Sequence, residues 1–161
     1  MALSVRRVVT GHDGDGKSVI VSDGPAPQVH DRAIFAEVWN TEGSPTRITA
    51  VAEREPNERS MQLGPPPQGS IIRVVEMPAG HRSAMHRTRT VDYGIVLEGE
   101  VYLVMEGTET LLHPGDIVIQ RGTNHAWDNR SDAPARMVFI LLAAEFAPEL
   151  EASVPDMALV P

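Results

Sequence analysis

The chain is 161 residues long, a length that fits one domain with a sizeable core of its own. Its net charge of −8 and its scattered lysines and arginines argue against a nucleic-acid partner, because affinity for a phosphate backbone depends on clustered basic side chains. It contains no cysteine, which excludes disulfides and thiolate ligands, so any metal must be held by histidine, carboxylate, hydroxyl or water.

The N-terminus lacks the apolar run of a signal peptide, and no stretch reaches the roughly 20 apolar residues needed to cross a bilayer. We therefore expect a cytoplasmic protein with no membrane partner. Thirteen glycines and thirteen prolines, with few long helical periodicities, indicate short strands joined by tight turns.

The first expected element is a hairpin. The β-branched residues 5–9 and the similar residues 18–21 flank the turn-rich sequence G-H-D-G-D-G. This turn resembles the start of a calcium loop at Asp13, but the twelfth position of such a loop is Gly24 here instead of the closing glutamate. We therefore prefer a plain turn.

Further strands are expected at residues 33–40, 47–51, 71–77, 93–97, 101–105, 110–112, 117–120 and 136–142. Residues 53–68 carry mixed charge and then three prolines, which indicates an exposed excursion. A plain surface loop is the preferred interpretation of this excursion, and a cover or edge for a pocket is the alternative. The tail, residues 145–161, is expected to hold a short helix or to pack on a neighbouring subunit. Many short strands at regular spacing predict an all-β sandwich or barrel.

A polar stripe lies just before the apolar residues 93–97. Its members are His86, Thr88, Thr90 and Asp92. Side chains two residues apart share one face of an extended strand, so all four are expected to point the same way. His125 comes from a second segment and meets the stripe if the two segments pair in one sheet. Two imidazoles and a carboxylate would then converge.

The spacing of this segment resembles a known motif. It runs Gly80-x5-His86-x-Thr88-x3-Asp92-x6-Gly99, and the first cupin motif is G-x5-H-x-H-x3–4-E-x6-G. The sequence G-D-I-V-I-Q-R-G-T-N-H-A-W-D-N, residues 115–129, resembles the second cupin motif with one residue fewer and with Gln120 in place of its proline. The linker between the motifs, residues 100–114, is short, as in single-domain cupins.

The resemblance implies a small antiparallel jelly-roll barrel and one cupin domain over residues 1–161. Within it, residues 1–69 hold the N-terminal strands and the excursion, residues 70–142 the barrel core, and residues 143–161 the tail. The sequence outside the motifs is similar to that of a subgroup of single-domain cupins labelled as oxidoreductases in secondary-metabolite pathways. This implies a metal-dependent enzyme, an oxidoreductase or oxygenase, acting on a small organic molecule inside the barrel. A lyase, isomerase or dehydratase is one alternative, and a non-catalytic small-molecule-binding cupin is another.

Carried over residue by residue, the resemblance implies the metal ligands His86, Asp92 and His125. Thr88 replaces the second histidine of the family and becomes a weak ligand or leaves space for water. Thr88 and Tyr93 are the candidate catalytic residues. Two histidines and a carboxylate favour iron, with manganese, nickel or zinc as alternatives. The other role for Asp92 is a hydrogen bond to a neighbouring threonine or histidine.

Several residues near the motifs have two possible roles. Trp127 fills the core or stacks on a flat substrate, and Asn129 ties a turn. The arginines at 87, 89 and 121 form surface salt bridges or clamp a substrate carboxylate. His81 and His113 are expected in loops, away from the ligand positions. A homodimer is expected, because small cupins commonly pair through edge strands and the N-terminal hairpin and the tail are available for packing.

Overall fold

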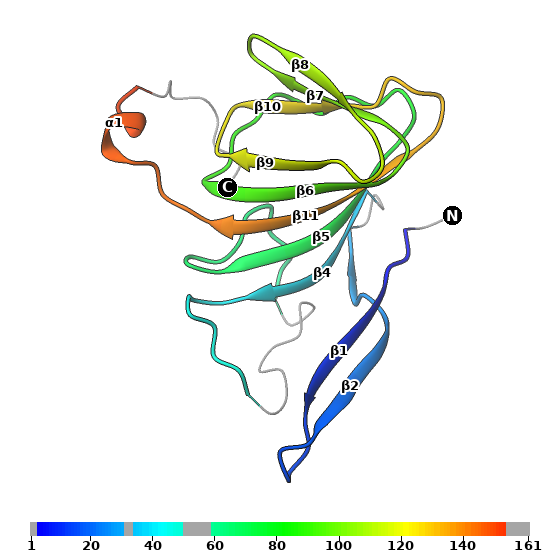
Figure 1. Ribbon diagram of the computed structural model, residues 1–161, viewed down its shortest axis with the longest axis vertical. Coiled ribbons are helices and arrows are strands. Elements are labelled where there is room, and N and C mark those ends of the chain that lie inside the picture. The colour runs from blue at the N-terminus through cyan, green and yellow to red at the C-terminus, as the bar shows by residue number, and fades with distance from the viewer. Residues whose placement is uncertain (1–2, 31–33, 50–58, 154–161) are drawn as a thin grey trace.

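The computed structural model of the protein describes residues 3–30, 34–49 and 59–153. These residues form eleven strands and one short helix (Figure 1). The elements are β1 (Arg6–His12), β2 (Ser18–Pro25), β3 (Gln28–Val29), β4 (Phe35–Thr41), β5 (Ser70–Met77), β6 (Thr90–Glu98), β7 (Val101–Met105), β8 (Glu109–Leu112), β9 (Ile117–Arg121), β10 (His125–Asp128), β11 (Ala135–Ala143) and α1 (Pro148–Glu151). The predicted all-β class and the short helix in the tail are therefore confirmed. No helix among the described residues is long and apolar enough to span a membrane.

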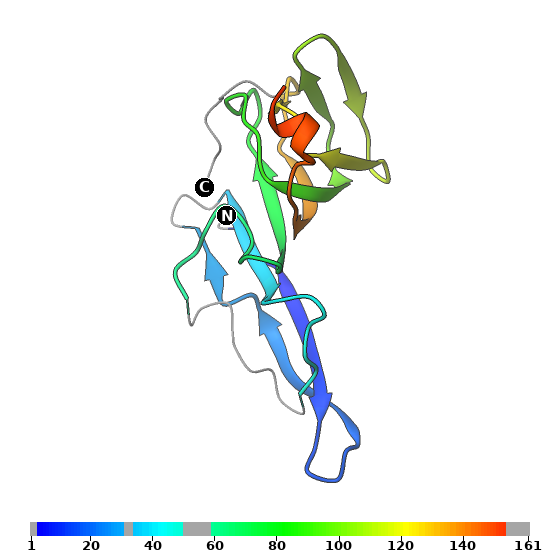
Figure 2. The same ribbon diagram turned by 90° about the vertical axis from the view of Figure 1, so that its left-hand side faces the viewer.

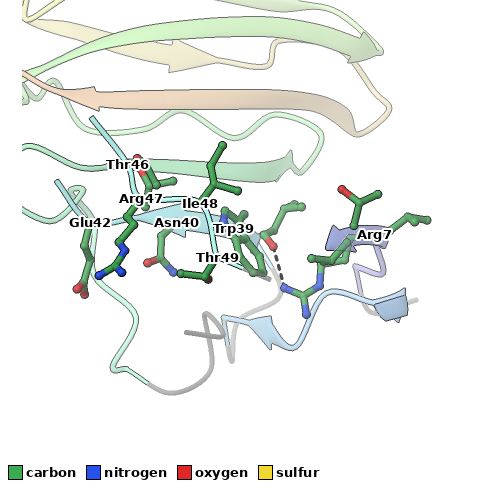
Figure 3. A pocket seen from close by; sticks show the side chains of 13 residues that line it. Arg7, Trp39, Asn40, Glu42, Thr46, Arg47, Ile48 and Thr49 are labelled. Carbon is green, nitrogen blue, oxygen red and sulfur yellow. Dashed lines mark hydrogen bonds between the residues drawn. The ribbon is translucent and has the colours of Figure 1, made fainter. Parts of the chain in front are cut away.

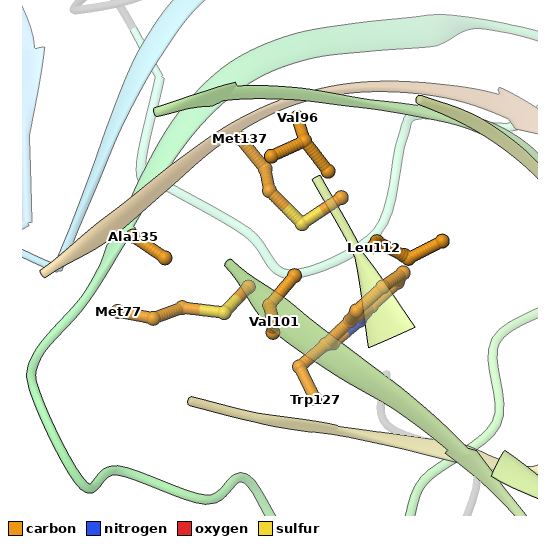
Figure 4. Packing of buried hydrophobic residues seen from close by; sticks show 7 residues of the cluster. All are labelled: Met77, Val96, Val101, Leu112, Trp127, Ala135 and Met137. Carbon is orange, nitrogen blue, oxygen red and sulfur yellow. The ribbon is translucent and has the colours of Figure 1, made fainter. Parts of the chain in front are cut away.

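Two antiparallel sheets enclose the core. The larger sheet has the strand order β3-β4-β5-β11-β6-β9, and the smaller has the order β10-β7-β8. Buried side chains from both sheets pack together between them (Figure 4). This cluster consists of Met77, Val96, Val101, Leu112, Trp127, Ala135 and Met137. The expected jelly-roll barrel of the cupin type is the fold that results.

The register of the larger sheet decides which side chains enter the barrel. Phe139 on β11 lies opposite Arg73 on β5 and opposite Gly94 on β6. Two residues further along β11, Leu141 lies opposite Asp92. Side chains two apart share a face, so these rows lie on the same side of the sheet. A Cβ on Gly94 would lie 3.1 Å from Cε1 of Phe139, so the absence of a side chain there makes room for the phenyl ring.

Two motif residues hold the turns, as expected. Gly99 has a φ of 71°, and a Cβ there would lie 2.7 Å from the carbonyl oxygen of Pro134, so only glycine fits. Asn129 is fully buried, and its Nδ2 donates to the carbonyl oxygens of Met77 (3.0 Å) and Ala133 (2.8 Å). This amide ties the end of β5 to the connection between β10 and β11.

Strands β1 and β2 pair only with each other and form a hairpin that projects from the barrel (Figures 1 and 2). The side chain of Asp13 accepts hydrogen bonds from the backbone N–H groups of Asp15 (3.0 Å) and Lys17 (2.9 Å). The interpretation of this sequence as a plain turn is consistent with these bonds, because they close the turn within the chain.

The strand expected at residues 47–51 is wrong for residues 47–49, which have no regular structure, and residues 50 and 51 lie outside the described part. The reason is the lack of a partner. Residues 47–49 pair with no strand of the described part of the chain, although β3 covers only Ala36 and Glu37 on its side of β4. A β-branched sequence alone does not form a strand unless it pairs with another strand.

Candidate functional site

The two motif histidines face each other where the smaller sheet begins. The backbone N–H of His86 donates to the carbonyl oxygen of His125, and the reverse bond is also made, both at 2.9 Å. The ring centroids are 4.3 Å apart. The expectation that His125 meets the polar stripe is confirmed, and this pairing brings the two imidazoles together.

Backbone carbonyl groups fix the tautomer of both rings. Nδ1 of His86 lies 2.9 Å from the carbonyl oxygen of Ala84, and Nδ1 of His125 lies 2.9 Å from that of Thr123. A carbonyl oxygen only accepts hydrogen bonds, so each Nδ1 carries the proton and each Nε2 keeps a lone pair. Burial lowers the pKa of His125 to about 4, so this ring is neutral at pH 7. Orientation of a ring by a carbonyl oxygen is typical of metal-binding histidines.

The histidines line a cavity of about 290 Å³ inside the barrel. Thr88 and Asp92 line the same cavity, as the parity of the polar stripe predicts. The hydroxyl of Thr90 donates to that of Thr88 over 2.7 Å, so the hydroxyl hydrogen of Thr88 remains available to a bound molecule.

Asp92 is a buried carboxyl group, 5% exposed, and its Oδ1 has no hydrogen-bond partner. Burial raises its pKa, and the Thr90 hydroxyl and the nearby positive charge of Arg73 oppose that shift. Among the described residues, no three His, Asp or Glu side chains are grouped closely enough to hold a metal ion. The residues present therefore fit a metal at two imidazole nitrogens, with the Asp92 carboxylate in the same pocket but not grouped with them.

Tyr93, a candidate catalytic residue, is not part of the pocket. It directly follows Asp92 on β6, and neighbouring side chains of a strand point to opposite faces. Tyr93 is 38% exposed and does not line the cavity. The prediction that its hydroxyl lies at the site is therefore wrong, because the strand parity that turns Asp92 inward turns Tyr93 outward.

None of the three arginines beside the motifs lines the cavity. Arg89 forms the expected surface salt bridge, with Glu151 of helix α1. Arg121 is exposed, whereas Arg87 is buried, contrary to the expectation of a surface position. The alternative in which these residues clamp a substrate carboxylate is not supported.

The arginine that does line the cavity is Arg73, which the sequence analysis missed. It is 6% exposed, its guanidinium carbon lies 5.0 Å from the ring centroid of Phe35, and its Nη2 donates to the carbonyl oxygen of Gln62 over 3.0 Å. A signal was present in the sequence, since Arg73 alternates with Ile71 and Val75 on the inner parity of an otherwise apolar strand. A charged residue at such a position is a functional candidate.

The excursion also contributes to the cavity, through Leu63. Arg59 in this segment forms an ion pair of 2.5 Å with the fully buried Glu37 of β4, and Nε2 of Gln28 donates to the carbonyl oxygen of Arg59 over 2.6 Å. These contacts and the Arg73–Gln62 bond hold the segment beside the barrel. The alternative of an edge for a pocket is confirmed at Leu63, and residues 53–58 lie outside the described part.

A second cavity, of about 650 Å³, lies outside the barrel beside β1 and β4 (Figure 3). Arg7 lies 5.3 Å from the ring centroid of Trp39 and donates to the carbonyl oxygen of Val38 over 3.2 Å. This cavity shares no lining residue with the barrel pocket and contains none of the motif residues. The motif chemistry therefore belongs to the smaller, inner cavity.

The chain is similar to known proteins of one family. The Cupin domain family model matches residues 73–141. The chain is 39% identical over 148 residues to "Phomopsin biosynthesis cluster protein C'" of Diaporthe leptostromiformis, covering 86% of this chain and 78% of that protein. It is 33% identical to "Cupin-domain-containing oxidoreductase fogC" of Aspergillus ruber, covering 86% and 72%. Among solved structures, a Cupin 2 conserved barrel domain protein from Salinispora arenicola CNS-205 is 21% identical, with a TM-score of 0.44, over 53% of this chain and 72% of that one.

Proposed function

The chain belongs to the cupin family, and on that basis we propose that it is an oxidoreductase-type cupin enzyme that acts on a small organic molecule inside the barrel. Curated relatives that carry the name cupin-domain-containing oxidoreductase support the reaction class. The inner cavity supports the place of the reaction, because the motif side chains converge there and not on the outer surface.

The observation that carries the proposal is the facing pair His86 and His125. Both rings donate Nδ1–H to backbone carbonyl groups, which leaves both Nε2 atoms as ligands for a divalent transition metal. We propose Asp92 as the carboxylate ligand because it lines the same pocket and its Oδ1 has no partner, although among the described residues it is not grouped with the two imidazoles. Two imidazoles and one carboxylate favour iron over manganese, nickel or zinc.

When bound, such a metal supplies open coordination positions for oxygen or for a chelating group of the substrate. The residues of the chain orient the imidazoles, bind the substrate and exclude water. The two carbonyl groups hold the imidazoles in one tautomer, and Thr88 offers its hydroxyl hydrogen to the substrate or to a water molecule. The rings of Trp127 and Phe139 exclude bulk water from the pocket.

Elemental analysis of protein purified without chelator tests the metal assignment. We expect about one transition metal per chain. Absence of a stoichiometric metal, together with activity that chelation leaves unchanged, would remove the metal from the proposal. Oxygen uptake during turnover then tests the oxidoreductase class, and turnover under strict anaerobiosis would contradict an oxygen-dependent reaction.

One observation favours a second function, a lyase or isomerase that works by proton transfer. The Asp92 carboxyl group is buried beside Thr88, lacks a partner at Oδ1 and has a raised pKa, which suits a general acid or base. This function predicts turnover without oxygen and without loss of activity on chelation. A protein that is stabilised by ligands but forms no product would instead be a binding cupin.

We also propose a homodimer in which the projecting hairpin packs on a second copy. The hairpin exposes apolar side chains, including Ile20, which is 64% exposed, and Val8, which is 46% exposed. Burial of such residues is a common reason for association. Light scattering is expected to give twice the chain mass for the native protein and a monomer for Ile20→Asp. A native monomer at all concentrations would contradict the proposal.

A further inference from the structure

The barrel pocket contains a cation that the proposed metal chemistry does not use. Arg73 is more than nine-tenths buried and lines the pocket, yet it makes a single hydrogen bond, from Nη2 to the carbonyl oxygen of Gln62. Its Nε is buried and has no partner. A guanidinium group carries five N–H donors, and leaving buried donors unpaired is costly. Among the described residues, the donors of Arg73 are therefore not all satisfied.

The neighbouring carboxylates do not supply that acceptor. Glu37 lies opposite Arg73 on the adjacent strand β4, but its Oε1 is held by Arg59 at 2.5 Å and by the amide of Asn40 at 3.2 Å. Within the described part of the chain, no carboxylate oxygen lies within 4.0 Å of the Arg73 nitrogens. Glu37 and Asp92 act on the charge of Arg73 through space, but neither makes a direct ion pair with it among the described residues.

An aromatic wall connects Arg73 to the histidine pair. The ring centroid of Trp127 lies 5.6 Å from that of His125 and 5.2 Å from that of Phe139. Phe139 in turn lies opposite Arg73 in the sheet, and the Arg73 guanidinium covers the ring of Phe35. The pocket thus has a polar end with the two imidazoles, a flat apolar wall, and a cationic end.

We infer that the pocket selects a small, flat organic carboxylate, whose carboxylate group binds Arg73 while its apolar body lies along Trp127 and Phe139. The planar guanidinium fork matches a carboxylate with two parallel hydrogen bonds. The cavity of about 290 Å³ is at the small end of the range of roughly 300–1,000 Å³ for ligand pockets. A flat carboxylate is thus the substrate class of the proposed enzyme. This rests on the proposed function in one respect, that the barrel pocket is the substrate site.

Calorimetric binding of matched probes to the full-length native protein tests the inference. 3-Phenylpropanoate and benzoate are each compared with the neutral amide of the same shape, and metal content is measured in the same sample. We expect each carboxylate to bind at least about tenfold more tightly than its amide. Equal binding of acid and amide, or no binding of either carboxylate at millimolar concentration, would overturn the inference.

Variants of Arg73 test whether this residue causes the preference for a carboxylate over its amide. Arg73→Gln is expected to bring the ratio of carboxylate to amide affinity close to one, whereas Arg130→Gln, a control whose ion pairs with Glu109 and Asp128 lie outside the pocket, keeps the native ratio. An unchanged ratio in folded Arg73→Gln would contradict the inference. If that variant does not fold, Arg73→Lys decides, because it keeps the charge but loses the bidentate fork, and its ratio is expected to fall below the native one.

The double variant His86→Ala, His125→Ala separates this inference from the proposed function. Its carboxylate preference is expected to persist although the metal is lost. Loss of the preference there would assign carboxylate binding to the metal and not to Arg73. A native protein without metal that still prefers carboxylates would contradict the metal proposal and leave the substrate class standing.

Discussion

The two ends of the barrel pocket come from different parts of the chain. The histidine end is built from the motif segments, which supply His86, Thr88 and His125. The arginine end is built from β5 and the excursion before it, which supply Arg73 and Leu63. In our proposal the first end sets the chemistry and the second selects the molecule. Proteins of one family can therefore share a reaction centre and differ in substrate through segments that no motif covers.

The largest expected effect lies at the histidine end. His86→Ala and His125→Ala each remove one of two imidazole ligands, which should lower metal affinity by more than about 100-fold. Elemental analysis measures the metal per chain. His113→Ala is the control, because this exposed residue lies in the turn before β9. Retention of metal by either motif variant, or its loss from the control, would contradict the division into two ends.

The next effect is structural and lies at the arginine end. Arg59→Ala leaves the fully buried carboxylate of Glu37 without its cation, which should lower the free energy of unfolding by about 3 kcal/mol. Urea unfolding measures the change. Arg6→Ala, which breaks the exposed pair with Asp23, should have no resolvable effect. If Arg59→Ala also loses its metal, the two ends are coupled and the comparison fails.

A smaller, pH-dependent effect follows from Glu37. Burial raises its pKa above the ordinary 4.5, so the folded state binds the proton more tightly than the unfolded state. The free energy of unfolding should therefore fall as the pH rises from 4.5 through the folded-state pKa. Glu37→Gln lacks this slope, so its stability relative to the native protein should increase over the same range.

Glu109→Gln is a control, because the native Glu109 should make stability depend on pH in the opposite direction. The hydrogen bond from Arg130 lowers the pKa of Glu109, so its stabilising contribution is present above pH 4.5 and is lost as the pH falls through the folded-state pKa. Urea midpoints between pH 4 and 7 distinguish the two residues. Parallel slopes for the two variants would show that burial does not govern Glu37.

The smallest expected effect concerns Leu63, which lines the pocket although it is 45% exposed. Leu63→Ala should weaken the binding of 3-phenylpropanoate by about threefold, because only part of the side chain is available to bury apolar surface on the ligand. Ile48→Ala, beside the outer cavity, should leave binding unchanged. Equal effects of the two variants would place the probe outside the barrel.

The barrel and the histidine end were predictable because both depend on local patterns. Period-two alternation and turn residues located most of the strands, and the same parity turned His86, Thr88 and Asp92 to one face. The alternation of side chains along a strand also predicts that Tyr93 points outward, because it directly follows Asp92. The prediction for Tyr93 failed because neighbouring residues of a strand point to opposite faces, however close they lie along the chain.

The arginine end depends on long-range packing that no local pattern records. The pairing of Glu37 with Arg59 joins β4 to an irregular segment 22 residues further along the chain. The failed strand at residues 47–49 has a related cause, since a strand needs a pairing partner as well as a suitable sequence. Only Arg73 could have been identified, because a charge on the inner parity of an apolar strand is unusual.

Anomalous diffraction from crystals grown without chelator tests the proposed metal centre most directly. At the absorption edge of the metal found by elemental analysis, one peak is predicted within about 2.0–2.2 Å of Nε2 of both His86 and His125. A crystal with no peak in the barrel pocket, or with its peak at another histidine such as His113, would contradict the proposal.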